Sequence, residues 1–217
     1  MENVKEWAAA LETSDRFDAV HDTQHIYRAL LEAMAFPGTV QDIGPVIQKL
    51  DDSLAFNRTA AGIALTLLDA EVSHAVQMAE AALLPDYIRR MTFSPVAPMN
   101  DADYVFADGD MDAEAIARII QSVKCGTHEG PDASATLLLK VTGFAEEQGT
   151  NERRLALSGP GIAIENECRV VGLTAEWLTE RERANGEYPV GIDLILYNGE
   201  GHLVALPRTT NLKEVER

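Results

Sequence analysis

The stretch that decides the fold is "YPVGIDLILYNGEGHLVALPRTT", residues 188–210. Two apolar runs flank a short polar segment with two glycines, which predicts two buried antiparallel strands joined by a tight turn. The first run contains Asp193, and the second ends on Pro-Arg-Thr-Thr, residues 207–210. Because charged groups are costly in a core unless they are paired, these residues require an explanation.

The turn length sets the register of this predicted hairpin. A four-residue turn over residues 198–201 places Tyr197 opposite His202 and Asp193 opposite Leu206. Under this pairing, Arg208 is a diagonal neighbour of Asp193 on the same face, about 7–8 Å away at the backbone. The long side chain of arginine spans that distance.

Two interpretations of the polar groups follow. In the first, Asp193 and Arg208 form an ion pair that neutralises an otherwise unpaired carboxylate. In the second, Arg208 and the hydroxyls of Thr209 and Thr210 bind a phosphate or phosphonate anion, because a guanidinium matches such oxyanions bidentately. The sequence leaves both open.

Outward from the hairpin, helical and strand patterns alternate along most of the chain. Apolar residues recur at helical spacing in the first helix, where Asp22 or Thr23 is expected to cap the N-terminus. The alternation predicts an α/β fold with a mixed β-sheet covered by helices, in a single domain over residues 1–217. Predicted helices cover residues 22–36, 57–68, 80–91, 111–123 and 174–185. Predicted strands cover 103–108, 135–144 and 169–173, another strand within 153–163 runs into the Gly-Pro-Gly turn at residues 159–161, and 73–79 fits either.

Net charge limits the class of partner. The chain has 18 basic and 35 acidic residues, for a formal net charge of -17. Nucleic-acid binding requires clustered Lys and Arg, so the composition argues against it. No apolar run reaches the roughly 18 residues of a membrane helix, and the N-terminus lacks a targeting pattern, so we expect a cytoplasmic protein with no membrane contact.

Candidate cofactor and metal sites are weak. Pyridoxal phosphate requires a lysine, and Lys140 is the best placed, but nothing near it in sequence supplies phosphate or pyridine partners. The "LSGPGIA" segment, residues 157–163, is typical of a plain turn because it lacks the spacing of a nucleotide-binding loop. The acidic run around residues 108–112 lacks the glycine and distal glutamate of a calcium loop. We therefore predict neither cofactor nor metal.

Nucleophilic chemistry has one candidate pair. Cys125 and His128 lie three residues apart in the loop "KCGTHEG", residues 124–130, but that spacing does not force a hydrogen bond. The chain has two cysteines, Cys125 and Cys168, without a CxxC motif, which favours free thiols over a disulfide or zinc site.

Several segments, in order, resemble a known family. They are "HDTQHIYRALLEAMAFPG", "GTHEGPDASATLLLKV", "LSGPGIA", and "YPVGIDLIL" followed by "ALPRTT". Over residues 17–210 the chain resembles PhnH, the H subunit of the bacterial carbon-phosphorus lyase system. The resemblance implies a fold like that of pyridoxal-phosphate-dependent transferases without the cofactor, and a homodimer when isolated.

The resemblance also implies a function. Members join the G, I and J subunits in a core complex that degrades phosphonates, supporting transfer of a ribose triphosphate unit from a purine nucleotide to phosphonate. The resemblance associates the G, H, I and L proteins with this transfer step. Radical cleavage of the carbon-phosphorus bond belongs to the J subunit, and no catalytic residue carries over to this chain. The leading hypothesis is a subunit that is not catalytic alone; the alternative is a self-sufficient enzyme that binds a phosphonate or nucleotide anion through Arg208, Thr209 and Thr210.

Overall fold

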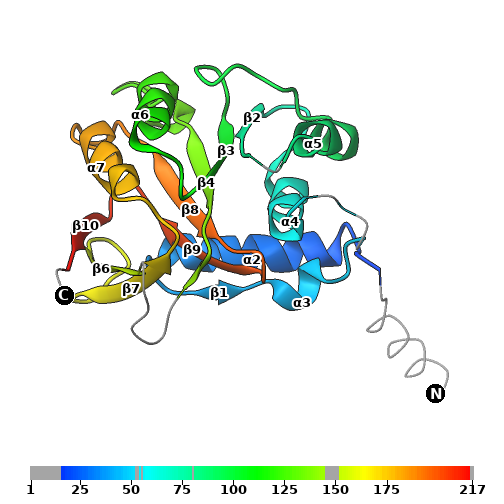
Figure 1. Ribbon diagram of the computed structural model, residues 1–217, viewed down its shortest axis with the longest axis horizontal. Helices are drawn as coiled ribbons and strands as arrows, with labels where there is room; N and C mark the ends of the chain where they lie inside the picture. Colours follow the sequence, from blue (N-terminus) through cyan, green and yellow to red (C-terminus); the bar gives the residue numbers. More distant parts are fainter. Residues whose placement is uncertain (1–15, 52–53, 55, 80, 145–151, 216–217) are drawn as a thin grey trace, which may run out of the picture.

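A six-stranded sheet forms the centre of the protein (Figure 1). The computed structural model describes residues 16–51, 54, 56–79, 81–144 and 152–215. Strands β2, β3, β4 and β8 run parallel, whereas β9 and β1 are antiparallel to their neighbours. The order is β1 (Gln41–Asp42), β9 (His202–Leu206), β8 (Asp193–Tyr197), β4 (Thr136–Lys140), β3 (Tyr104–Asp108), β2 (His74–Gln77).

Helices cover both faces of this sheet, which confirms the predicted α/β class. Leu138 of β4 packs in one core cluster with α2, α4 and α5, while Leu137 and Leu139 pack in another with α6 and α7. Alternate residues of a strand point to opposite faces, so an unbroken apolar run such as residues 137–139 serves both layers. The helices are α2 (His21–Ala35), α3 (Gly44–Ile47), α4 (Arg58–Leu67), α5 (Leu84–Thr92), α6 (Ala113–Ser122) and α7 (Ala175–Ala184), with a 3₁₀ turn at Pro131–Ala133.

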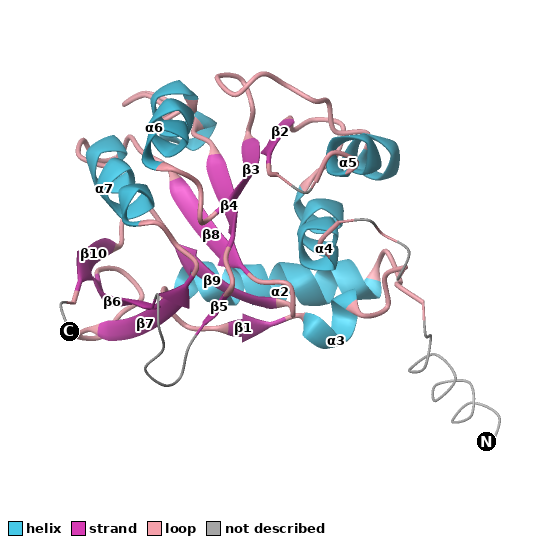
Figure 2. Cartoon of the chain, viewed as in Figure 1, coloured by secondary structure: helices cyan, strands magenta, loops and turns pink. Residues whose placement is uncertain are grey.

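A second, four-stranded antiparallel sheet was not predicted (Figure 2). Its order is β10 (Asn211–Glu214), β6 (Glu152–Ser158), β7 (Asn166–Val171), β5 (Gly143–Phe144). The predicted strand over residues 135–144 is divided between the two sheets. The Val141 N–H donates to Tyr197 O (2.8 Å) in the first sheet, but the Thr142 N–H donates to Val171 O (2.9 Å) in the second.

The register predicted for the hairpin is wrong by one residue. Tyr197 lies opposite Leu203 rather than His202, and Leu194 rather than Asp193 lies opposite Leu206. The Asn198 N–H donates to His202 O (3.0 Å), so the connection is a three-residue loop over residues 199–201. The Asn198 side-chain oxygen orders this loop by accepting the N–H groups of Glu200 (3.1 Å) and His202 (2.9 Å). Gly201 closes this loop with a φ of 97°, a conformation that favours glycine.

The predicted cap of the first helix is also corrected. Helix α2 begins at His21, and Asp18 accepts the N–H groups of Val20 (2.8 Å) and His21 (2.9 Å). These backbone bonds lower the pKa of Asp18 to about 2. Asp22 is instead buried and pairs with Lys49 (2.9 Å).

Other predicted elements agree within a few residues. The segment over residues 73–79 is strand β2, and Pro85 occupies the first turn of α5, where its missing N–H costs nothing. The predicted start of that helix at residue 80, and the N-terminal residues 1–15, lie outside the described residues. None of the described helices combines the length and the apolar character needed to cross a membrane.

Candidate functional site

The end of the β8–β9 hairpin brings together the two charges singled out in the sequence. Arg208 Nη2 lies 2.5 Å from Asp193 Oδ2, and their side chains are only 17% and 14% exposed. The Arg208 Nε also contacts both carboxylate oxygens (3.2 and 3.3 Å), and its backbone N–H donates to Oδ1 (2.6 Å). The pair lies at the edge of the core, where a lone carboxylate would be costly.

The rest of the Arg208 guanidinium is also occupied. Its Nη1 donates to Pro131 O (2.8 Å) and lies 3.5 Å from Pro189 O, and its Nη2 donates to the Ser134 hydroxyl. Each nitrogen therefore has an acceptor in the protein. An anion at Arg208 would have to displace one of these acceptors, so anion binding by Arg208 stays a prediction that the geometry does not favour.

Thr209 and Thr210 follow in the turn that leads into β10. Thr209 is half-buried, whereas Thr210 is 2% exposed. The Thr210 N–H donates to Pro207 O (2.9 Å), but its side-chain hydroxyl has no hydrogen-bond partner. Of the two threonines, only Thr210 therefore offers a buried, unused polar atom.

A cavity of about 560 Å³ opens between α7 and β10, and we call it the α7–β10 pocket. Its wall contains Arg208 and Thr210, together with residues that the sequence did not single out as a site. Its two sides come from distant parts of the sequence, which the second sheet brings next to α7. The additional lining residues are Ser158, Ala175, Leu178, Thr179, Arg181, Glu182, Asn185, Asn211, Leu212, Lys213 and Glu214.

Arg181 is the main functional candidate that sequence reasoning missed. It is 3% exposed, and its Nη2 contacts the carbonyl oxygens of Pro207 (2.5 Å), Thr210 (3.1 Å) and Leu206 (3.5 Å). Burial lowers the pKa of Arg181 to about 10, against the opposite influence of Asp193 and Glu182. The guanidinium is still charged at neutral pH.

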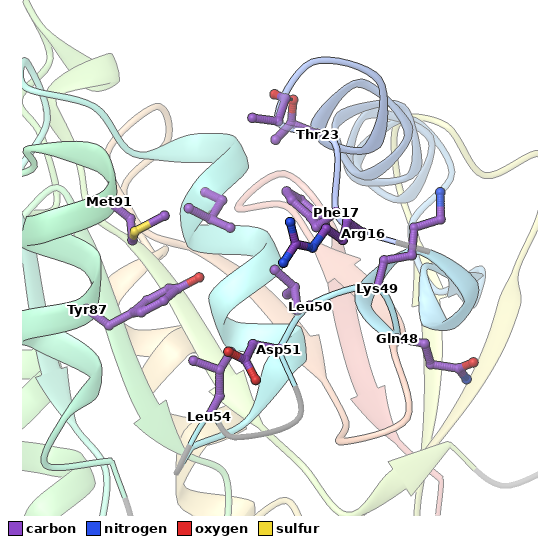
Figure 3. Close-up of a pocket in the computed structure, with 12 residues that line it drawn as sticks. Arg16, Phe17, Thr23, Gln48, Lys49, Leu50, Asp51, Leu54, Tyr87 and Met91 are labelled. Atoms are coloured by element: carbon purple, nitrogen blue, oxygen red, sulfur yellow. The ribbon is translucent and has the colours of Figure 1, made fainter. Parts of the chain in front are cut away.

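A larger cavity of about 830 Å³ lies near the start of α2, and we call it the Lys49 pocket (Figure 3). Lys49, Asp51, Tyr87 and Met91 are among its lining residues. The Lys49 ammonium is paired with Asp22, and burial together with Asp51 raises the pKa of Tyr87. It contains none of the predicted site residues, and its lining includes no cysteine or histidine.

Lys140 lies at the carboxyl ends of the parallel strands, beside a shallow cavity of about 430 Å³. Ligands of open α/β sheets commonly bind at this edge. Asp108 and Asp110 share the cavity, and Asp108 accepts the Ala79 N–H (2.8 Å). One cation beside two carboxylates is a poor match for a phosphate group, which hydrogen-bond donors and positive charge would hold.

The structure does not place the two cysteines or the acidic run around residues 108–112 in a catalytic or metal-binding arrangement within the part of the chain that it describes. Burial raises the pKa of Cys125, and raises that of Cys168 to about 12, so both favour the unreactive thiol. Within the described residues, no hydrogen bond joins Cys125 to the exposed His128, and no group of three or more acidic, His or Cys side chains could hold a metal ion. Asp112 instead caps α6 by accepting the Ala115 N–H (2.8 Å).

The fold and these cavities define a class: an α/β protein with largely buried arginine side chains at one end of its sheet and with two cysteine thiols whose pKa values are raised by burial. Comparison with known proteins identifies the family. Residues 15–213 match the family of the bacterial phosphonate metabolism protein PhnH. The chain is also 31% identical, over 205 residues, to a protein of Stutzerimonas stutzeri named "Putative C-P lyase subunit protein HtxG", covering 94% of this chain and 93% of that protein. The chain therefore belongs to the PhnH family.

Proposed function

We propose that this protein is a subunit of a carbon-phosphorus lyase complex in phosphonate catabolism. The observation that carries the proposal is the nearly full-length similarity to a relative named as a putative subunit of that lyase. Similarity over more than nine-tenths of both chains supports a shared role for the whole protein rather than for one module.

Within such a complex, the protein supports transfer of a ribose triphosphate unit from a purine nucleotide to phosphonate. Its partners are the G, I and J subunits, it forms a homodimer when isolated, and it acts in the cytoplasm without a cofactor of its own. The likeness to pyridoxal-phosphate-dependent transferases belongs to the same proposal. Each of these points rests on the family resemblance.

Local chemistry supports a role that requires partners. The Arg208 guanidinium is occupied by protein acceptors, and burial raises the pKa of both thiols. The net charge of -17 repels a nucleotide triphosphate unless cationic groups of partner subunits offset it. A protein with these properties is poorly equipped to process the nucleotide alone.

The proposal is tested by reconstitution. The purified protein is incubated with ATP and methylphosphonate, first alone and then with the G, I, J and L subunits, and release of the purine base is followed by chromatography. We expect no turnover by the protein alone, co-elution with the partners on size exclusion, and turnover that requires this protein. Turnover by the isolated protein would support the self-sufficient enzyme instead, and failure to co-elute would contradict the subunit proposal.

A further inference from the structure

We propose that the α7–β10 pocket binds the phosphate or phosphonate group of a small organic molecule, with Arg181 as the counter-charge and Thr210 as a hydrogen-bond donor. The phosphonate branch of this inference rests on the proposed function.

The charges at this corner do not balance. Arg181 and Arg208 are both largely buried, and Asp193 is held by Arg208 through contacts down to 2.5 Å. Arg181 forms no ion pair within the described part of the chain, so two guanidinium groups share one carboxylate. Since an uncompensated buried charge is costly, a bound anion supplies the second negative charge at this corner.

Nearby carboxylates do not supply that charge in the structure. Glu214 pairs with Arg153 (2.5 Å), and Glu180 pairs with Arg183. Glu182 lines the pocket and its charge favours the charged form of Arg181, but its side chain is exposed and it forms no ion pair with a described residue. Glu182 is therefore the internal competitor that an added anion would have to displace.

Unused hydrogen-bond donors lie in the same wall. The Nε of Arg181 and the hydroxyl of Thr210 are buried without a partner, although buried donors are nearly always satisfied. The three contacts of Arg181 to carbonyl oxygens all involve Nη2. Both atoms are buried, although their residues line the pocket, so binding requires rotation of the Thr210 side chain and a shift of the guanidinium that expose them.

The size of the pocket indicates an organic ligand rather than a free inorganic ion. A volume of about 560 Å³ falls among small-molecule sites, which span roughly 300–1,000 Å³. Leu178 and Leu212 provide apolar surface for the organic part, and Lys213 adds a positive charge at the rim. An arginine with hydroxyl and lysine neighbours suits a tetrahedral oxyanion.

Trp177 provides a direct readout, because it is fully buried one helical turn before Arg181. In the full chain, Trp7→Phe removes the other tryptophan, so that emission reports on Trp177. The protein is titrated with methylphosphonate, glycerol 3-phosphate and inorganic phosphate at constant ionic strength, with chloride and acetate as control anions. We expect saturable changes with at least one organic phosphate or phosphonate, tighter than with inorganic phosphate, and none with chloride.

Two variants assign the response to the pocket. Thr210→Val retains the shape of the side chain but removes the hydroxyl. It should weaken binding about tenfold or more, because a hydrogen bond to a charged group contributes more free energy than one between neutral groups. Arg181→Lys should abolish saturation, and circular dichroism establishes whether that variant is folded. If it is not folded, Lys213→Gln tests whether the positive charge at the rim of the pocket contributes to binding. The matched control is Arg89→Gln, an exposed arginine paired with Asp86 (3.2 Å).

An unsaturable response, or equal affinity in Thr210→Val and in the parent, would overturn the inference. Saturation by methylphosphonate but not by glycerol 3-phosphate assigns the pocket to phosphonates, and the converse assigns it to organic phosphates. Loss of association with the partner subunits would not alter this titration, so failures of the two proposals can be told apart.

Discussion

Two arginines at the end of the hairpin, the buried Arg181 and the partly buried Arg208, carry a positive charge away from solvent, but their partners differ. Arg208 has a carboxylate, Asp193, and additional acceptors from two other segments. Arg181 approaches the same turn from α7, and its hydrogen-bond partners among the described residues are backbone carbonyls. Carbonyl dipoles hold a guanidinium in place without cancelling its charge. The difference indicates that Arg208 is built for stability, while Arg181 retains a positive charge available to a ligand.

The largest effect is expected when the compensated arginine loses its partner. Asp193→Asn leaves the largely buried Arg208 without its ion-pair partner and should cost about 4 kcal/mol in the free energy of unfolding. Urea denaturation measures this cost. The matched control is Asp86→Asn, which breaks an exposed pair and should cost under about 1 kcal/mol. Equal costs for the two variants would contradict the proposed structural role of Asp193.

Removal of the uncompensated arginine should cost less. Arg181→Met leaves three carbonyl oxygens without their donor, a loss of about 2 kcal/mol, but it also removes an unpaired buried charge. The same urea titration ranks this variant against Asp193→Asn. A greater loss in Arg181→Met would show that its charge is already compensated in the free protein.

His74 is a third buried basic side chain, but unlike the two arginines it can lose its charge near neutral pH. It is buried, its Nδ1 lies 2.8 Å from the Ser94 hydroxyl, and burial lowers its pKa, against a smaller opposite influence from the Pro85 backbone. Because the folded pKa lies below the unfolded value near 6.5, the unfolded state binds more protons as pH falls through that range. Its contribution to stability is present above pH 6.5 and is lost on acidification.

His74→Gln should therefore reduce the difference in urea midpoint between pH 7.5 and pH 5.5. His128→Gln, in an exposed loop, is the control variant. An unchanged pH dependence in His74→Gln would show that His74 does not contribute to it. The expected effect is smaller than that of either arginine-site variant.

The smallest change is expected at Thr210. Thr210→Val removes a buried hydroxyl that has no partner, so stability should stay within about 1 kcal/mol of the wild type, on the stabilising side. Thermal unfolding without added anions measures this. A clear destabilisation would mean that the hydroxyl has a partner in solution, and it would weaken the argument for an unused donor.

Apolar pattern and turn chemistry were sufficient to predict the α/β class and most helices. They could not predict the second sheet, because the division of residues 135–144 depends on backbone partners more than 25 residues away. The one-residue error in the hairpin has a local cause. Asn198 orders the loop with its own side chain, so the connection has three residues rather than four.

The candidate site was predictable only in part. Arg208 stands out because it follows an apolar strand, whereas Arg181 lies in "TERERA", residues 179–184, where charges are typical of a solvated helix face. One signal was present: Trp177 and Arg181 are four residues apart and share a helix face. The depth of that face depends on β10 and the turn before it, which no local pattern specifies.

The turn over residues 207–210 has a further consequence, since it carries the chain from the last strand of one sheet into the edge strand of the other. Arg181 contacts the carbonyl oxygens of Pro207 and Thr210 at the two ends of this turn. These contacts restrain the backbone that connects the two sheets. A ligand that binds the guanidinium would weaken these contacts, and the connection between the sheets would become more mobile. Hydrogen exchange at the backbone amides of β10 would then report whether the pocket is filled, and this readout does not require an assay of catalysis.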